Sequence, residues 1–164
     1  MIARRTYMRN AIILIAGYPY FKRAKAQDNS KSPLLPWPGD LPALALQAQR
    51  QGEPLVLMVS LPGCPWCELL RRNYLGPMRN EGVAAFEFMI HDRSKPLLDF
   101  KALRTTPDAL SKALKIKITP TLLFFNAQGQ EIAPRIEGVA SADFIGAILD
   151  ERLATARERI KAAR

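Results

Sequence analysis

The two cysteines of the chain, Cys64 and Cys67, are separated by only two residues. On a helix, residues three apart share one face with their Cβ atoms about 5–6 Å apart, and a modest adjustment brings them to disulfide distance. The pair follows an apolar run over residues 54–61 and a break at Pro62-Gly63, so Cys64 is expected at a helix N-terminus. Unpaired N–H groups and the helix dipole stabilise a thiolate there. We therefore expect Cys64 to be the attacking thiol and Cys67, one turn further in and less exposed, to be the resolving thiol.

Other uses of such a pair compete with redox chemistry. A zinc site needs two further ligands, but His91 is the only histidine and there is no third cysteine. Two thiolates together with a methionine would suit copper(I). A purely structural disulfide would close a very short loop and stabilise the fold little. The position of the pair between a strand and a helix favours redox use, with copper(I) binding as an alternative.

Side chains near the cysteines supply candidate contacts and a candidate base. Pro65 suits the first turn of a helix, where its missing N–H costs nothing. Trp66 is expected to be exposed and to contact a substrate, because exposed aromatic residues are favoured at interfaces. Glu68 is the nearest candidate proton acceptor, although it also fits an ordinary solvated helix position. Glu87 and His91, on the next strand, are further candidates.

The elements that position these residues alternate between helix and strand patterns. Helices are expected over residues 41–51, 64–75 and 107–114 and after Ser141, and strands over residues 54–61, 85–92, 121–126 and 130–136. Strands joined through helices pair in parallel, and a closing hairpin adds an antiparallel edge. The sequence therefore predicts an α/β fold with a mixed central sheet of about four to five strands, flanked by helices.

Several boundaries rest on local signals. Asp40 and Thr106 are expected to cap helices, as is Ser141 for the last helix. Gly76-Pro77 is expected to end the second helix, and Gln128-Gly129 to form the turn of the closing hairpin. Residues 93–106 are expected to form a short helical insertion. The apolar stripe of the last helix is expected to comprise Phe144, Ile145, Ile148, Leu149, Ala156 and Ile160.

The first 26 residues have the order of an export signal: a basic segment, a short apolar run over residues 11–17 and an Ala-Lys-Ala cleavage pattern. Arg4-Arg5 and the residues after them resemble a twin-arginine signature. We expect export to a bacterial periplasm, where disulfide chemistry is permitted. Residues 27–40 are then a linker, residues 41–155 the domain and residues 156–164 a basic helical tail.

The net charge of +9 does not by itself predict a nucleic-acid partner. Residues 1–26 hold six basic residues and no acidic one, so the rest of the chain has a balance of only +3. No run of 18 or more apolar residues exists, which excludes a polytopic membrane protein. We expect no nucleic-acid partner, and contact with a membrane only through the leader if it is retained.

The sequence resembles the thioredoxin superfamily over residues 41–155. The segment from Pro54 to Cys67 is similar to its central strand and active-site helix. Residues 114–126 are similar to the segment with its cis-proline, and Gly138 with the helix after Ser141 is similar to its C-terminal end. The resemblance implies a thioredoxin fold in which Pro120 is cis and faces the cysteines. Thr119 would then offer its backbone to an extended substrate beside Cys64.

Three positions depart from thioredoxin itself. Met58 stands where a buried aspartate assists the resolving cysteine, Phe88 falls near the lysine paired with that aspartate, and Gly63 replaces the tryptophan before the first cysteine. These departures argue against a general thioredoxin role.

Together with the export signal expected at residues 1–26, the resemblance implies an exported thiol–disulfide oxidoreductase that exchanges disulfides with a protein carrying a disulfide or a dithiol. We favour the reductase direction, fed by a membrane electron donor, over the oxidase direction, because oxidising relatives usually carry a longer helical insertion than residues 93–106 allow. No organic cofactor and no metal is expected. The alternative is a redox-inactive thioredoxin-like binding module or a copper(I)-binding protein.

Overall fold

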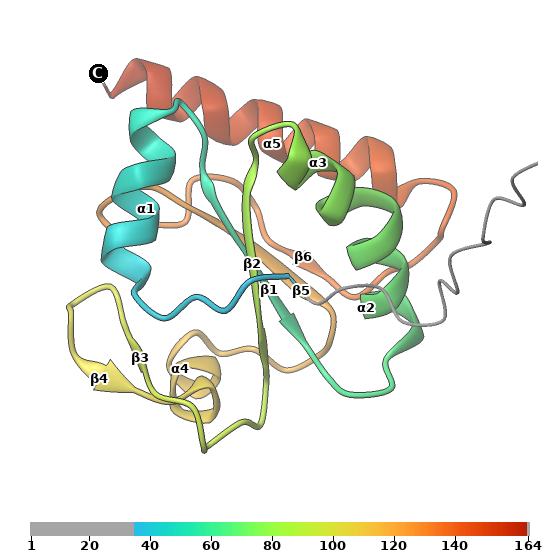
Figure 1. Cartoon of the computed structure of the whole chain (residues 1–164). Helices are drawn as coiled ribbons and strands as arrows, with labels where there is room; N and C mark the ends of the chain where they lie inside the picture. The colour runs from blue at the N-terminus through green and yellow to red at the C-terminus, as the bar shows by residue number, and fades with distance from the viewer. Residues whose placement is uncertain (1–34, 164) are drawn as a thin grey trace, which may run out of the picture.

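A computed structural model describes residues 35–163, and its centre is a four-stranded mixed sheet (Figure 1). The strand order is β2-β1-β5-β6, where β1 spans Leu55–Ser60, β2 Ala84–Met89, β5 Thr121–Phe125 and β6 Ile136–Glu137. Strand β1 pairs in parallel with β2 and antiparallel with β5, and β6 closes the sheet antiparallel to β5. The predicted fold class, a mixed sheet flanked by helices, is confirmed.

Helices cover both faces of the sheet, which explains why the two central strands are apolar throughout. Every residue of β1 and β5 is buried. Leu55, Leu57 and Val59 pack with α1 (Leu41–Arg50) and α4 (Pro107–Ala113) on one face. Val56 and Met58 pack with the helices after the cysteines and with α5 (Ile145–Ala162) on the other face. Alternate side chains of a strand point to opposite faces, so a strand covered on both sides reads as a continuous apolar run.

The helix after the cysteines is longer than predicted. It continues from α2 (Pro65–Leu70) through a π-helical turn, η1 (Arg71–Leu75), into α3 (Gly76–Asn80), so the expected end at Gly76-Pro77 is wrong. The N–H of Gly76 bonds to the carbonyl of Arg71, five residues back, and this widened turn lets the helix continue past a proline. A Cβ at position 76 would lie 2.8 Å from the Arg71 carbonyl oxygen, which explains the glycine.

Residues 93–106 contain a two-stranded hairpin, so the predicted helical insertion is wrong. Strand β3 (Leu97–Leu98) pairs antiparallel with β4 (Arg104–Thr105). The Asp99 side chain accepts hydrogen bonds from the N–H groups of Lys101 and Leu103, at 2.9 Å each. An aspartate that captures nearby backbone N–H groups favours a turn over a helix.

The segment before α1 runs alongside the sheet and its neighbouring hairpin. The carbonyl of Pro36 accepts from the N–H of Glu87 on β2, and the carbonyl of Gly39 accepts from the N–H of Leu98 on β3. Leu35 is buried. Asp40 caps α1 through the N–H of Ala43, as predicted.

The connection between β5 and α5 differs from the prediction at both of its ends. The predicted strand over residues 130–136 is reduced to β6 and a single bridge between Phe125 and Glu131. Helix α5 begins at Ile145, and Ser141 accepts from the N–H of Asp143 in the preceding turn instead of capping the helix.

Helix α5 lies across the sheet (red in Figure 1), and residues 156–162 continue it. Ala156 and Ile160 are buried as predicted, whereas Phe144 is exposed, so its place in the predicted stripe is wrong. Leu153 fills a further buried position of the stripe. Within residues 35–163, no helix combines the length and apolar character needed to cross a bilayer.

Candidate functional site

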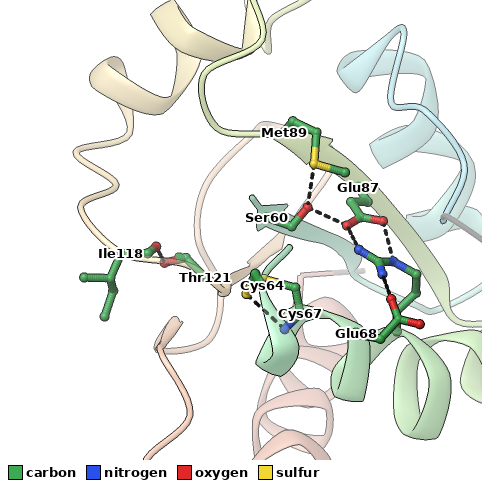
Figure 2. Close-up of a disulfide and its surroundings, with 9 residues drawn as sticks. Ser60, Cys64, Cys67, Glu68, Glu87, Met89, Ile118 and Thr121 are labelled. Carbon is green, nitrogen blue, oxygen red and sulfur yellow. Dashed lines mark hydrogen bonds and ion pairs between the residues drawn. A yellow bond between two sulfur atoms is a disulfide. The ribbon is translucent and has the colours of Figure 1, made fainter. Parts of the chain in front are cut away.

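Cys64 and Cys67 form a disulfide at the start of α2, with their Cα atoms 5.3 Å apart (Figure 2). Cys64 is the N-cap residue, and its Sγ accepts a hydrogen bond from the N–H of Cys67 at 3.1 Å. Cys64 is partly exposed, whereas Cys67 is fully buried. The predicted difference in exposure between the two sulfurs is confirmed. In the reduced protein the same N–H and the helix dipole would stabilise a thiolate on Cys64.

The disulfide lies where two central strands meet. Strand β1 ends at Ser60, four residues before Cys64, and β5 begins at Thr121. The two strands are antiparallel, with Val59 opposite Thr121, so the end of β1 lies beside the start of β5. The residues just before β5 therefore lie at the same edge of the sheet as the disulfide.

Those residues include a cis peptide bond between Thr119 and Pro120, as the resemblance implied. Pro120 is buried and its carbonyl accepts from the N–H of Gly138, while Thr119 stays partly exposed. The hydroxyl of Thr121 donates to the carbonyl of Ile118 at 2.8 Å (Figure 2). These bonds hold the segment before β5 in place next to the cysteines.

A buried ion pair connects the active-site helix to β2. The guanidinium of Arg71 donates to both carboxylate oxygens of Glu87, at 3.0 and 2.6 Å, and also to Glu68. Arg71 and Glu87 are only 6% and 3% exposed. The hydrogen bond to Glu87 is the main cause that raises the pKa of Arg71 above its ordinary value, so the guanidinium is charged.

The network continues into the end of β1. The hydroxyl of Ser60 donates to Glu87 and lies 3.2 Å from the sulfur of Met89 (Figure 2). The N–H of Leu35 donates to the other Glu87 oxygen at 3.3 Å. Glu87 thus accepts bonds from the helix, from β1 and from the segment before α1. The arrangement fixes the helix that carries Cys67 against the sheet.

Sequence reasoning missed Arg71. The available signal was its place one helical turn after Cys67, on the face that Leu70 and Cys67 bury.

Glu68 and Glu87, the candidate proton acceptors, both contact Arg71, and a proton-accepting role for Glu68 stays a prediction. His91 instead lies beside Asp108, with its Nδ1 4.0 Å from Asp108 Oδ1. Met58 and Phe88 are buried apolar residues.

Large exposed apolar side chains lie next to the disulfide in the sequence and on the segment before Pro120. Trp66 is 42% exposed, as predicted, and Leu61 and Ile118 are also large exposed apolar residues. Pro65 occupies the first turn of α2 and is exposed. Contact of these side chains with a substrate stays a prediction. Residues 35–163 contain no group of three or more His, Cys, Asp or Glu side chains that could hold a metal ion.

The thioredoxin-like domain family matches residues 42–153, and the chain belongs to this family. The chain is thus a thioredoxin-like protein with a C-x-x-C disulfide, and both features are consistent with thiol–disulfide exchange. A comparison with curated protein sequences finds no match.

Several solved structures are similar to this chain at low sequence identity. A thioredoxin-fold protein from Helicobacter pylori is 16% identical, with coverage of 73% of this chain and 91% of the other and a TM-score of 0.44. The oxidoreductase DsbH is 17% identical, with coverage of 84% and 94% and a TM-score of 0.49. The reduced periplasmic thioredoxin SoxS from Paracoccus pantotrophus is 19% identical, with coverage of 63% and 99% and a TM-score of 0.42.

Proposed function

We propose that the protein is a thiol–disulfide oxidoreductase in which Cys64 attacks and Cys67 resolves. The observation that carries the proposal is the asymmetry of the pair: Cys64 is partly exposed and accepts the N–H of Cys67, while Cys67 is buried one turn below. A thiolate is the species that attacks a disulfide, and stabilising it at the exposed position directs the first attack there.

The reaction of the reduced protein proceeds in two exchanges. The Cys64 thiolate attacks one sulfur of a substrate disulfide, a Cys64–substrate disulfide forms, and the other substrate sulfur leaves as a thiolate that takes up a proton. Cys67 then loses its proton and attacks Cys64, which forms the Cys64–Cys67 disulfide and releases the second substrate thiol. Two electrons pass from the protein to the substrate, so the substrate is reduced and the protein oxidised.

Thr119 and Trp66 are the residues proposed to hold the substrate. The partly exposed backbone of Thr119, before the cis bond to Pro120, supports pairing with an extended substrate segment. Trp66 and Pro65 are exposed within the C-x-x-C motif and can contact that segment. The partner is then a protein that presents a disulfide or a dithiol.

The proposal also includes the direction of electron transfer and the cellular location of the protein. The two-stranded hairpin within residues 93–106 leaves this part of the chain without a helical insertion, which supports reduction over oxidation. We propose export to the periplasm and supply of electrons by a membrane donor. The export signal at residues 1–26 lies outside the described residues.

Insulin reduction with dithiothreitol tests the proposal. We expect the wild-type protein to accelerate the reaction and Cys64→Ser to leave only the background rate, since Cys64 makes the first attack. Equal background rates for both proteins would instead identify a binding module. The reduction potential of the cysteine pair decides the direction of electron transfer: a value of about −270 mV indicates a reductant and one of about −120 mV an oxidant.

A further inference from the structure

The positive charge outside the leader is concentrated in one segment. Residues 91–117 carry seven basic and three acidic side chains, whereas the rest of residues 27–164 carries eleven basic and twelve acidic ones. All seven basic residues of the segment are exposed. The excess positive charge of residues 27–164 therefore lies on the chain between β2 and β5.

Part of this segment lines a cavity of about 250 Å³. His91, Arg93 and Lys112 contribute cationic or protonatable side chains to it, and Ile90 and Ile116 contribute apolar surface. Ser111 also lines it, and its hydroxyl is buried with no hydrogen-bond partner among the described residues. The cavity thus combines positive charge with a hydrogen-bond donor that the fold leaves unused.

Asp108 holds Arg93 and Lys112 in place, and its single negative charge does not neutralise both of them. Its carboxylate accepts from Lys112 Nζ at 2.8 Å and from Arg93 Nε at 3.2 Å, and His91 lies 4.0 Å away. The hydrogen bond from Lys112 is the main cause that lowers the pKa of Asp108. The Asp108 side chain is 12% exposed, whereas those of Arg93 and Lys112 are 75% and 70% exposed. An incoming molecule therefore meets the two cations before the carboxylate.

The cavity lies at the edge of the sheet that carries the disulfide. Strands β1 and β2 are parallel, so Ile90 and His91, which follow β2, leave the sheet at the same edge as Cys64, which follows β1. Ile116 precedes Thr119 by three residues. Three residues of extended chain span at most about 10 Å. A peptide that pairs with Thr119 can therefore reach the cavity within a few residues of its cysteine.

We infer that this cavity binds acidic side chains of the disulfide substrate, a few residues from its reacting cysteine. The inference rests on the proposed function and adds the chemical class of the partner: a protein with an acidic segment beside its disulfide. A peptide fits better than a nucleic acid, because Arg93, Lys112 and Asp108 together give the cavity a net charge of only about +1. Nucleic-acid affinity depends on many phosphate contacts.

Peptides of one sequence test the inference. Each carries a single cysteine activated as a 2-pyridyl disulfide, with three nearby positions occupied by Glu, Gln or Lys. Reaction with the reduced protein yields the peptide thiol, 2-thiopyridone and the Cys64–Cys67 disulfide. We expect the Glu peptide to react with a kcat/KM about tenfold above that of the Gln peptide, and the Lys peptide to react most slowly. The advantage should shrink when the salt concentration is raised from about 20 to about 500 mM, because salt screens the attraction between exposed charges.

Variants that remove the charges of the cavity test whether the advantage of the Glu peptide depends on this cavity. Arg93→Gln/Lys112→Gln should lower the kcat/KM of the Glu peptide about fivefold and leave that of the Gln peptide unchanged. Lys161→Gln is the matched control, because Lys161 is 67% exposed and pairs with Glu158 on its own helix much as Lys112 pairs with Asp108. Equal rates for the three peptides, or an undiminished advantage in the double variant, would overturn the inference.

A binding measurement separates the inference from the proposed function. Failure of even the Gln peptide to react would reject the oxidoreductase. Titration with a cysteine-free acidic peptide should still shift the backbone amide NMR signals of His91, Ser111 and Lys112 if the cavity binds carboxylates. Unmoved signals, or larger shifts with a single-stranded oligonucleotide of equal charge, would overturn the assignment.

Discussion

Arg71 and Glu87 show how a single buried pair can determine the position of a reactive helix. Both side chains are almost fully buried, and Glu87 also accepts bonds from Ser60 and Leu35. Burying two charges is costly, and their mutual contact offsets the cost only while both partners are present. The pair therefore acts as a positioning contact for the helix that carries Cys67.

Removing one partner should destabilise the fold more than removing both charges. Arg71→Met and Glu87→Gln are each expected to lower the free energy of unfolding by about 3 kcal/mol. Arg71→Met leaves the buried Glu87 carboxylate without its cationic partner, and Glu87→Gln leaves the buried Arg71 guanidinium with the partly exposed Glu68 as its remaining carboxylate partner. The double variant Arg71→Met/Glu87→Gln should lose less than either single variant. Urea unfolding measures all three, and a loss in the double variant equal to the sum of the single losses would contradict this explanation.

At this scale, sequence reasoning found the residues whose chemistry is visible in their type and spacing. The C-x-x-C spacing gave Cys64 and Cys67 and the burial of the second sulfur, and the resemblance gave the cis bond before Pro120. Arg71 was missed because its buried carboxylate partner, Glu87, lies 16 residues further along the chain. A helix pattern alone gives no reason to bury an arginine.

At the scale of elements, Asp108 joins the start of α4 to the loop after β2. It accepts from Lys112 within the helix and from Arg93 in the loop. These bonds favour the charged carboxylate in the folded protein, which lowers its pKa below the ordinary value of 3.8. A lowered pKa means that these hydrogen bonds stabilise the folded protein at pH values above 3.8. This stabilisation is lost as the pH falls through the lowered pKa of Asp108.

Asp108→Asn should therefore destabilise the protein in a pH-dependent way. The variant is expected to unfold at lower urea concentration than the wild type at pH 7, and the difference should vanish as the pH falls well below 3.8. Asp150→Asn, on an exposed position of α5, is the control and should change the midpoint little at either pH. A difference for Asp108→Asn that persists unchanged in acid would reject the ionic cause.

The boundaries of helices and strands were predictable where the local sequence signal is strong. Their prediction failed where contacts or helix geometry that the local sequence does not indicate determine the boundary. Asp40 and Thr106 cap their helices as expected, because each side chain bonds an N–H three residues on. The continuation of the helix past Pro77 needs a π-helical turn, which the sequence does not indicate. Residues 97–105 contain leucines typical of a helix, but Asp99 stabilises a turn between two short strands.

At the scale of the whole molecule, α5 completes one of the two layers that cover the sheet. Ala156 and Ile160 are buried in the core beside β5 residues, and Arg157 pairs with both carboxylate oxygens of Glu53, just before β1. The predicted boundary at residue 156 falls inside this helix. The order of strands and helices and the burial of Ala156 and Ile160 were predictable from periodicity. The basic residues after Ala156 suggested a separate tail, whereas α5 continues through residue 162.

Deletion of residues 156–164 should destabilise the whole domain. Loss of buried Ile160 alone removes about 1.5–3 kcal/mol of apolar burial. We expect the deletion to lower the free energy of unfolding by about 3 kcal/mol or more, measured by urea unfolding. Deletion of residues 161–164, most of which are exposed, is the control and should cost little. Equal stability of the longer deletion and the wild type would show that the end of α5 is a dispensable tail.

The central claim, that Cys64 attacks and Cys67 resolves, is tested most directly by trapping the intermediate. The reduced variants Cys67→Ser and Cys64→Ser are mixed with a peptide disulfide, and the adducts are followed by mass spectrometry. We predict that Cys67→Ser accumulates one stable mixed disulfide per molecule, on Cys64, and that Cys64→Ser reacts about 100-fold more slowly, because Cys67 is fully buried. Adducts that form equally fast on both variants, or on Cys64→Ser alone, would contradict the assignment.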